Sequence, residues 1–306
     1  MRQAKTSTKC AGIDVGKRWL DAAVHGRDGT IRVANSAAGW DELTAWLGEQ
    51  EVRRVGLEAS GGYERQVRAA LAAAGLEVVL HQPLEVRLFA RLKRLRAKND
   101  RIDAVLIAAA TAQTDAVKAA ADPRLQELAE RLTAYEQISD QLAELKAFME
   151  HVQLKDVISA LRLQMRSLKA LKGRLAAQVI AGLKAHPDLL ERYRLLNSLT
   201  GIGPIIAASL VVRMPELGQM KHGQAAALLG VAPFDRDSGQ YKGLRFISGG
   251  RRRPRRLVYL AALNAKRWDP TFKTVADRLT ARGKPTRVVL VAVMFRLSAA
   301  ANLLLA

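Results

Sequence analysis

Cysteine is almost absent from this 306-residue sequence, which contains only Cys10. A single cysteine excludes a disulfide framework and a thiolate zinc site. The histidines do not have the spacing of metal ligands either; they are His25, His81, His151, His186 and His222. Any metal in this chain is therefore expected on oxygen ligands.

Long hydrophobic runs are missing as well. The apolar stretch at 288–295 is too short to span a bilayer, and Arg296 follows it directly, so we expect a buried C-terminal helix. The basic N-terminus lacks a clean apolar segment, so we expect no signal peptide. These features favour a cytoplasmic protein, which its charge would associate with the nucleoid.

Acidic residues are scarce relative to basic ones: 29 Asp and Glu stand against 49 Lys and Arg, a net charge of +20. A field of that sign favours polyanions, and nucleic acid is the default partner. The alternative is a protein that is basic for solubility alone.

Four of the acids stand out by position. Asp14 in GIDVGK and Glu58 in VGLEASGGYE each end an apolar run, whereas Asp100 and Asp103 lie three residues apart in KNDRIDA. Carboxylates at the ends of buried strands are costly unless something neutralises them. Four oxygen donors suit Mg²⁺, at one or two positions.

Residues 9–104 alternate between strand and helix patterns. Three short strands separated by glycine-containing turns predict a β-meander, and helix and strand then alternate twice. This order is that of the ribonuclease-H-like fold, in which the first and fourth strands are neighbours. Asp14 and Glu58 would then face each other at the carboxyl edge of the sheet. Asp100 and Asp103 would share one helix face above them.

The rest of the chain is predicted to be helical, which makes the fold class α/β plus all-α. Residues 124–172 contain no glycine or proline and carry leucines at near-heptad spacing, which predicts a coiled coil. It would be either one straight helix or, more compactly, an antiparallel hairpin that turns near His151–Asp156. We therefore divide the chain into residues 1–120, 121–186 and 187–306. The middle part is expected to make a homo-oligomer, either a dimer or a tetramer.

Two segments of the last part predict nucleic-acid contacts. Gly201 and Gly203 separate two apolar stretches, as in a helix-hairpin-helix motif, where a helix start approaches a phosphate. A helical corner without a ligand is the alternative. A basic, glycine-punctuated stretch follows, with Lys242, Arg245, Arg251, Arg252, Arg253, Arg255 and Arg256.

Ser238 lies on a predicted turn just before this basic stretch, where a serine would be close to a bound phosphodiester. Asp-Ser-Gly is also a common turn without catalytic meaning. Ser248 and Tyr241 are rival nucleophiles in the same loop.

A second basic stripe precedes the paired aspartates. Arg87, Arg91, Arg94 and Lys98 recur at helical spacing and would grip a nucleic-acid backbone, or simply form a solvated face.

Taken together and in this order, GIDVGK, LEASGGYE, KNDRIDA and GVAPFDRDSGQYKGLRFISGGRRRPRRLVYLAAL resemble the DEDD transposases of the IS110 insertion-sequence type. Piv-type DNA invertases are close relatives of these enzymes. The resemblance covers nearly the whole chain. It implies a RuvC-like N-terminal domain, a coiled coil and a C-terminal transposase domain. One departure is Asn99, where many relatives have threonine.

The resemblance also implies roles for individual residues. The four catalytic, metal-binding acids of the family fall on Asp14, Glu58, Asp100 and Asp103, and its nucleophilic serine falls on Ser238. Such enzymes cut and rejoin double-stranded donor and target DNA through a covalent phosphoserine. A structured noncoding RNA that pairs with both DNAs guides them. Asp103 and Ser238 are 135 positions apart in the sequence. The acids and the serine of one active site would therefore come either from one chain or from two chains of an oligomer.

Three other functions use the same residues differently. A RuvC-type nuclease would use the four acids with water as the nucleophile, and Ser238 would be idle. GIDVGK also resembles the phosphate loop of actin-like kinases, but those proteins need a second similar domain, and a coiled coil and a basic helical region are expected after residue 105 instead. A noncatalytic nucleic-acid binder would retain the acids as structural residues.

Overall fold

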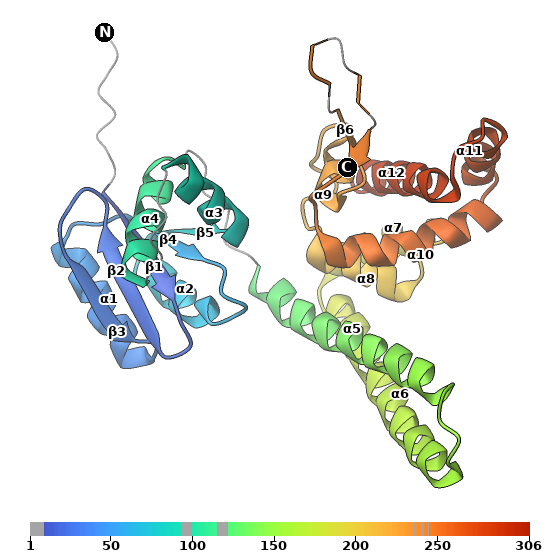
Figure 1. Cartoon of the computed structure of the whole chain (residues 1–306), viewed down its shortest axis with the longest axis horizontal. Coiled ribbons are helices and arrows are strands. Elements are labelled where there is room, and N and C mark those ends of the chain that lie inside the picture. Colours follow the sequence, from blue (N-terminus) through green and yellow to red (C-terminus); the bar gives the residue numbers. More distant parts are fainter. Residues whose placement is uncertain (1–8, 94–99, 115–121, 236, 240–241, 244) are drawn as a thin grey trace. The chain divides into compact units, whose positions relative to one another are not determined.

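The computed structural model describes residues 9–93, 100–114, 122–235, 237–239, 242–243 and 245–306, without the side chains of 100 and 101. The chain forms two compact units, residues 1–120 and 121–306 (Figure 1). The first unit contains a five-stranded sheet, and the second is largely helical. The mixed α/β class is therefore confirmed, whereas the division into three domains stays a prediction.

The first unit follows the predicted order of elements. Its strands are β1 (Cys10–Val15), β2 (Trp19–Val24), β3 (Thr30–Ala34), β4 (Arg54–Glu58) and β5 (Glu77–His81), and its helices are α1 (Ala37–Glu49), α2 (Glu64–Ala73), α3 (Pro83–Leu92) and α4 (Asp100–Ala112). The sheet order is β3-β2-β1-β4-β5, so β1 and β4 are neighbours as expected. The first three strands are antiparallel, whereas β1, β4 and β5 run parallel.

The two faces of the sheet differ in character because strand side chains alternate in direction. One face packs Ile13 and Leu57 against Leu43 of α1 and Leu71 of α2 in an apolar core. The opposite face is covered by α4, which packs on β1, β2 and β4. The two faces thus give the unit a layered α/β structure (Figure 1).

Glycines on β1 and β4 allow α4 to approach the sheet closely. A β-carbon added to Gly12 would overlap the backbone of Ala104 and Ala108, and one added to Gly56 would overlap the Thr111 hydroxyl. Because the side chains on each strand alternate, residues 14 and 58 point to the same face as these glycines. The helix that carries the paired aspartates therefore covers the strands that carry Asp14 and Glu58.

The second unit begins with a long helical hairpin. Its arms are α5 (Pro123–Met149) and α6 (Lys155–Lys184), which lie side by side and turn where the sequence predicted (Figure 1). Leu128 and Leu132 are buried near the base of the hairpin, whereas Phe148 and Leu163 are exposed toward its tip.

The remaining helices form the main apolar core of this unit. They are α7 (Pro187–Ser198), α8 (Pro204–Arg213), α9 (Gln224–Leu229), α10 (Arg252–Trp268), α11 (Pro270–Ala281) and α12 (Thr286–Leu304), with the short strands β6 (Pro233–Phe234) and β7 (Phe246–Ile247) between α9 and α10. Proline opens α7, α8 and α11, where its missing N–H costs nothing. α12 is long and apolar enough to cross a membrane, but Val289, Val293 and Leu297 bury one side of it in the core, as expected of a core helix.

Candidate functional site

The carboxyl ends of β1 and β4 bring two of the predicted acids side by side. The strands pair in parallel with Gly12 opposite Gly56 and Ile13 opposite Leu57. The next step of this register sets Asp14 beside Glu58, on the face that α4 covers. Both side chains are half-buried.

The direction of α4 brings its first turn toward the same edge. At the far end of the helix, the carbonyl of Thr114 accepts a hydrogen bond of 2.9 Å from Arg54, the first residue of β4. The first turn, with Asp100 and Asp103, therefore lies toward the opposite end of the strands, where Asp14 and Glu58 are located. Asp103 is half-buried, and the side chain of Asp100 lies outside the described residues.

The donor set fits a hard divalent cation, because it consists of carboxylates alone. Within the described residues, no three His, Cys, Asp or Glu side chains form a ready-made metal site. The backbone thus brings together the elements that carry the acids, while the assignment of the four acids as ligands stays a prediction.

A carboxylate that the sequence analysis missed holds the loop after Glu58. Glu64 is buried, and its Oε2 accepts hydrogen bonds from Ser60 N (3.1 Å), Ser60 Oγ (3.0 Å) and Gly62 N (2.8 Å). Burial raises the pKa of Glu64, but these hydrogen bonds outweigh that effect and lower it below its ordinary value. An acid two residues after a double glycine was the available signal.

A buried histidine also ties α4 to the sheet. His81 at the end of β5 lies 2.9 Å from the hydroxyl of Thr111, which in turn donates to the carbonyl of Ile107 (2.7 Å). Because the hydroxyl proton is used in that bond, His81 Nε2 must be the donor to Thr111. Burial lowers the pKa of His81, which favours its neutral form. The pair fixes the position of α4 over Gly56.

Ser238 belongs to the other unit and lies in the segment between β6 and β7, where it is exposed. Arg245 forms ion pairs with Asp235 and with Asp237. Asp237 directly precedes the serine in the sequence. Asp237 also accepts a hydrogen bond from Gly243 N (3.1 Å). An arginine is therefore held close to the serine along the chain. Tyr241 lies outside the described residues.

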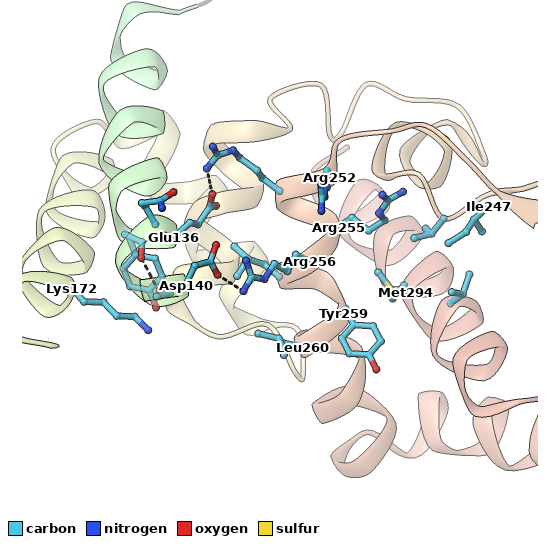
Figure 2. A pocket seen from close by; sticks show the side chains of 17 residues that line it. Glu136, Asp140, Lys172, Ile247, Arg252, Arg255, Arg256, Tyr259, Leu260 and Met294 are labelled. Carbon is cyan, nitrogen blue, oxygen red and sulfur yellow. Dashed lines mark hydrogen bonds and ion pairs between the residues drawn. The ribbon is translucent and has the colours of Figure 1, made fainter. Parts of the chain in front are cut away.

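Several arginines predicted to bind nucleic acid are engaged within the protein. Arg253 pairs with Glu136 and Arg256 with Asp140, each at 2.5 Å, so α10 is joined to α5 (Figure 2). The hydrogen bond from Arg256 lowers the pKa of the Asp140 carboxyl. These pairs line a cavity of about 870 Å³, which Lys172 and Arg252 also border.

The other arginines of this stretch differ in their partners. Arg251 binds Glu216 at 2.5 Å and the carbonyl of Arg213 at 2.6 Å, whereas Arg255 donates to the carbonyls of Gly230 (3.1 Å) and Gly249 (2.9 Å). Lys242 and Arg252 form no ion pair with an acid that the structure describes. They are the members of the set best suited to meet an external phosphate.

The two glycines of the helix-hairpin-helix pattern have different surroundings. A β-carbon on Gly201 would crowd Ala261 and Ala265 of α10, and its φ is +92°, so packing alone accounts for glycine there. Gly203 precedes α8 as its N-cap, and a β-carbon there would meet nothing within 4 Å. Gly203 is the stronger of the two candidate phosphate contacts.

The basic stripe of the first unit is described only in part. Arg87 and Arg91 are exposed on α3, one helical turn apart. Arg94 and Lys98 lie outside the described residues.

Two family models match the chain. One, described as a DEDD transposase of the IS110 type, matches residues 11–157, and the other, described as the transposase IS116/IS110/IS902 family, matches residues 193–277. The first range contains all four predicted acids, and the second contains Ser238.

Two curated proteins are similar as well. The insertion element IS110 uncharacterized 43.6 kDa protein of Streptomyces coelicolor is 31% identical over 130 residues, which cover 42% of this chain and 31% of that protein. The pilin gene-inverting protein of Moraxella bovis is 24% identical over 299 residues, 94% of this chain and 92% of that protein. The two family models together span most of the sequence, and the chain belongs to the IS110 family of transposases.

Proposed function

We propose that this protein is a DNA recombinase that moves or inverts DNA by cutting and rejoining phosphodiesters. The observation that carries the proposal is the pairing of β1 with β4, which sets Asp14 beside Glu58 beneath the helix of Asp100 and Asp103. The sheet order supports a ribonuclease-H or RuvC-like fold for this unit. The name of the Moraxella bovis relative supports recombination as the reaction class.

The four acids are proposed to hold magnesium ions against the DNA backbone. Mg²⁺ bound there would neutralise and polarise the scissile phosphate. The protein contributes the geometry: the strand register fixes Asp14 against Glu58, Glu64 holds the loop behind Glu58, and the contact of His81 with Thr111 holds α4.

Ser238 is proposed to attack the phosphorus atom. Its oxygen forms the new bond to phosphorus while the bond to one DNA oxygen breaks, and the serine proton is lost as the departing oxygen gains one. The product is a phosphoserine and a free DNA hydroxyl. Reversal with a new hydroxyl rejoins the strands, so the energy of the phosphodiester is conserved.

The partners follow from charge and family. Lys242 and Arg252, with Gly203, Arg87 and Arg91, are proposed to contact donor and target DNA or a structured noncoding guide RNA. The exposed apolar side chains at the hairpin tip support oligomerisation through a coiled coil of α5 and α6. We place the protein in the cytoplasm, with the nucleoid.

The competing function is a RuvC-like structure-specific endonuclease that uses water. Covalent trapping separates the two functions. When cleavage of labelled DNA is stopped by denaturing the protein, the parent should carry covalently bound DNA label, whereas Ser238→Ala should carry none. Ser248→Ala, a serine in the same stretch, should form the adduct like the parent. Normal cleavage by Ser238→Ala would favour the endonuclease instead.

A further inference from the structure

The predicted acid pair belongs to a polar row that crosses the whole sheet. Asp21 of β2 is the partner of Asp14 in the antiparallel pairing, and Arg32 of β3 is the partner of Asp21. His81 of β5 is the partner of Glu58 on the other side. Since directly paired residues point to the same face, all five side chains lie on the face that α4 covers.

Asp21 is the most deeply buried acid of the row, with 4% of the residue exposed. Arg32 grips it with two parallel hydrogen bonds, Nε to Oδ1 at 2.9 Å and Nη2 to Oδ2 at 2.8 Å. A buried carboxylate is tolerated only with a counter-charge, and the bidentate arginine supplies one. The arginine side chain itself is about half exposed.

Asp21 also lies directly opposite Asp14 on the neighbouring strand. Side chains directly opposite each other on antiparallel strands have β-carbons roughly 4.5–5.5 Å apart, and like charges in such pairs are destabilising. Aspartate opposite aspartate on a covered face is therefore unfavourable in isolation. A divalent cation at Asp14 would reverse the sign of that interaction.

We propose that Asp21 is a positioning residue of the metal centre. Its charge strengthens the binding of a divalent cation at Asp14 and Glu58 without Asp21 being a ligand, and Arg32 limits this effect. The inference rests on the proposed function, because it assumes a metal bound by the predicted acids. If Asp21 and Arg32 formed only a structural ion pair, the metal affinity would not depend on either residue.

The roles of the pair predict effects of opposite sign. Asp21→Asn removes a negative charge next to the site, so the dissociation constant for Mn²⁺ should rise about threefold to tenfold. Arg32→Gln removes a positive charge, so Mn²⁺ should bind more tightly than to the parent, although the metal-free protein melts at a lower temperature. The double variant should lie between the two single variants, because the charges offset each other.

The test is a titration of the full-length chain with Mn²⁺, in which electron paramagnetic resonance measures the concentration of free Mn²⁺. The melting temperature is also measured with and without the ion. Asp28→Asn is the matched control, because it makes the same charge change on the exposed turn after β2 and should bind like the parent. Asp14→Asn marks the loss expected of a true ligand. If Asp21→Asn does not fold, Arg32→Gln still tests the predicted sign.

Equal Mn²⁺ affinity in Asp21→Asn, Arg32→Gln and the parent would overturn the inference while leaving the proposed function intact. A loss in Asp21→Asn as large as in Asp14→Asn would make Asp21 a ligand and overturn the positioning role. A parent that binds no Mn²⁺ would overturn the inference and the proposed metal site together.

Discussion

Gly12 of β1 lies directly against Ala108 of α4, and a β-carbon on the glycine would overlap the backbone nitrogen of the alanine. The absence of a side chain at this point sets how closely the helix of Asp100 and Asp103 approaches the strand of Asp14. Packing at one glycine and the position of the predicted acids are therefore coupled.

Gly12→Ala should move α4 away from the sheet, because the contact is with backbone that cannot rotate aside. We expect a loss of about 1–3 kcal/mol in the free energy of unfolding, measured by chemical denaturation, and a fall in metal-dependent cleavage. Gly48→Ala is the control, because a β-carbon there meets nothing within 4 Å. Equal stability of Gly12→Ala and the parent would mean that the contact is not close.

Acid should weaken the loop behind Glu58 through Glu64. Its pKa lies below the ordinary value of 4.5 in the folded protein, so its contribution is fully present above that pH and is lost as the pH falls through the folded pKa. Glu64→Gln should lower the free energy of local opening of α2 and the preceding loop by roughly 1–2 kcal/mol at pH 7, so their amide hydrogens should exchange faster than in the parent. The difference from the parent should shrink below about pH 4.5, and a constant difference would argue against the carboxylate.

The arginines of α10 should differ in their effect on nucleic-acid binding. Arg252→Gln should lower the slope of log affinity against log salt by about one, because Arg252 is proposed to meet a phosphate. Arg251→Gln, at the neighbouring position, should leave that slope unchanged, because Arg251 already binds Glu216 and the carbonyl of Arg213. Equal slopes in the two variants would contradict this assignment.

Strand patterns and turns were enough to predict the sheet of the first unit and the neighbourhood of β1 and β4, because each strand has its own apolar run and turn signal. The helical pattern also predicted α5 and α6, and the chain adopts the more compact hairpin of the two expected forms. These features depend on residues close in sequence.

The partners of the basic residues were not predictable, because they lie far away in sequence. Arg253 meets Glu136 across 117 positions, and no local pattern links them. The packing of Gly201 on Ala261 is equally remote, so its glycine was read as a phosphate contact. The roles of Glu64 and Thr111 likewise emerge only when the loop and α4 are in place.

The tip of the helical hairpin should carry an oligomer interface. Leu163 is 62% exposed within a single chain, so Leu163→Lys should lower the sedimenting mass while the melting temperature stays near that of the parent. Gln126→Lys adds the same charge near the base of the hairpin and should leave the mass unchanged. An unaltered mass for Leu163→Lys would exclude this residue from the interface.

The most direct test of the metal-centred mechanism is a crystal structure of the protein with DNA and Mn²⁺, measured at a wavelength where manganese scatters anomalously. The predicted result is an anomalous peak within coordination distance of Asp14, Glu58 and the aspartates of α4, with a DNA phosphate oxygen bound to the same ion. Peaks only at other sites, or acids that point to separate surfaces in the presence of DNA and Mn²⁺, would contradict it.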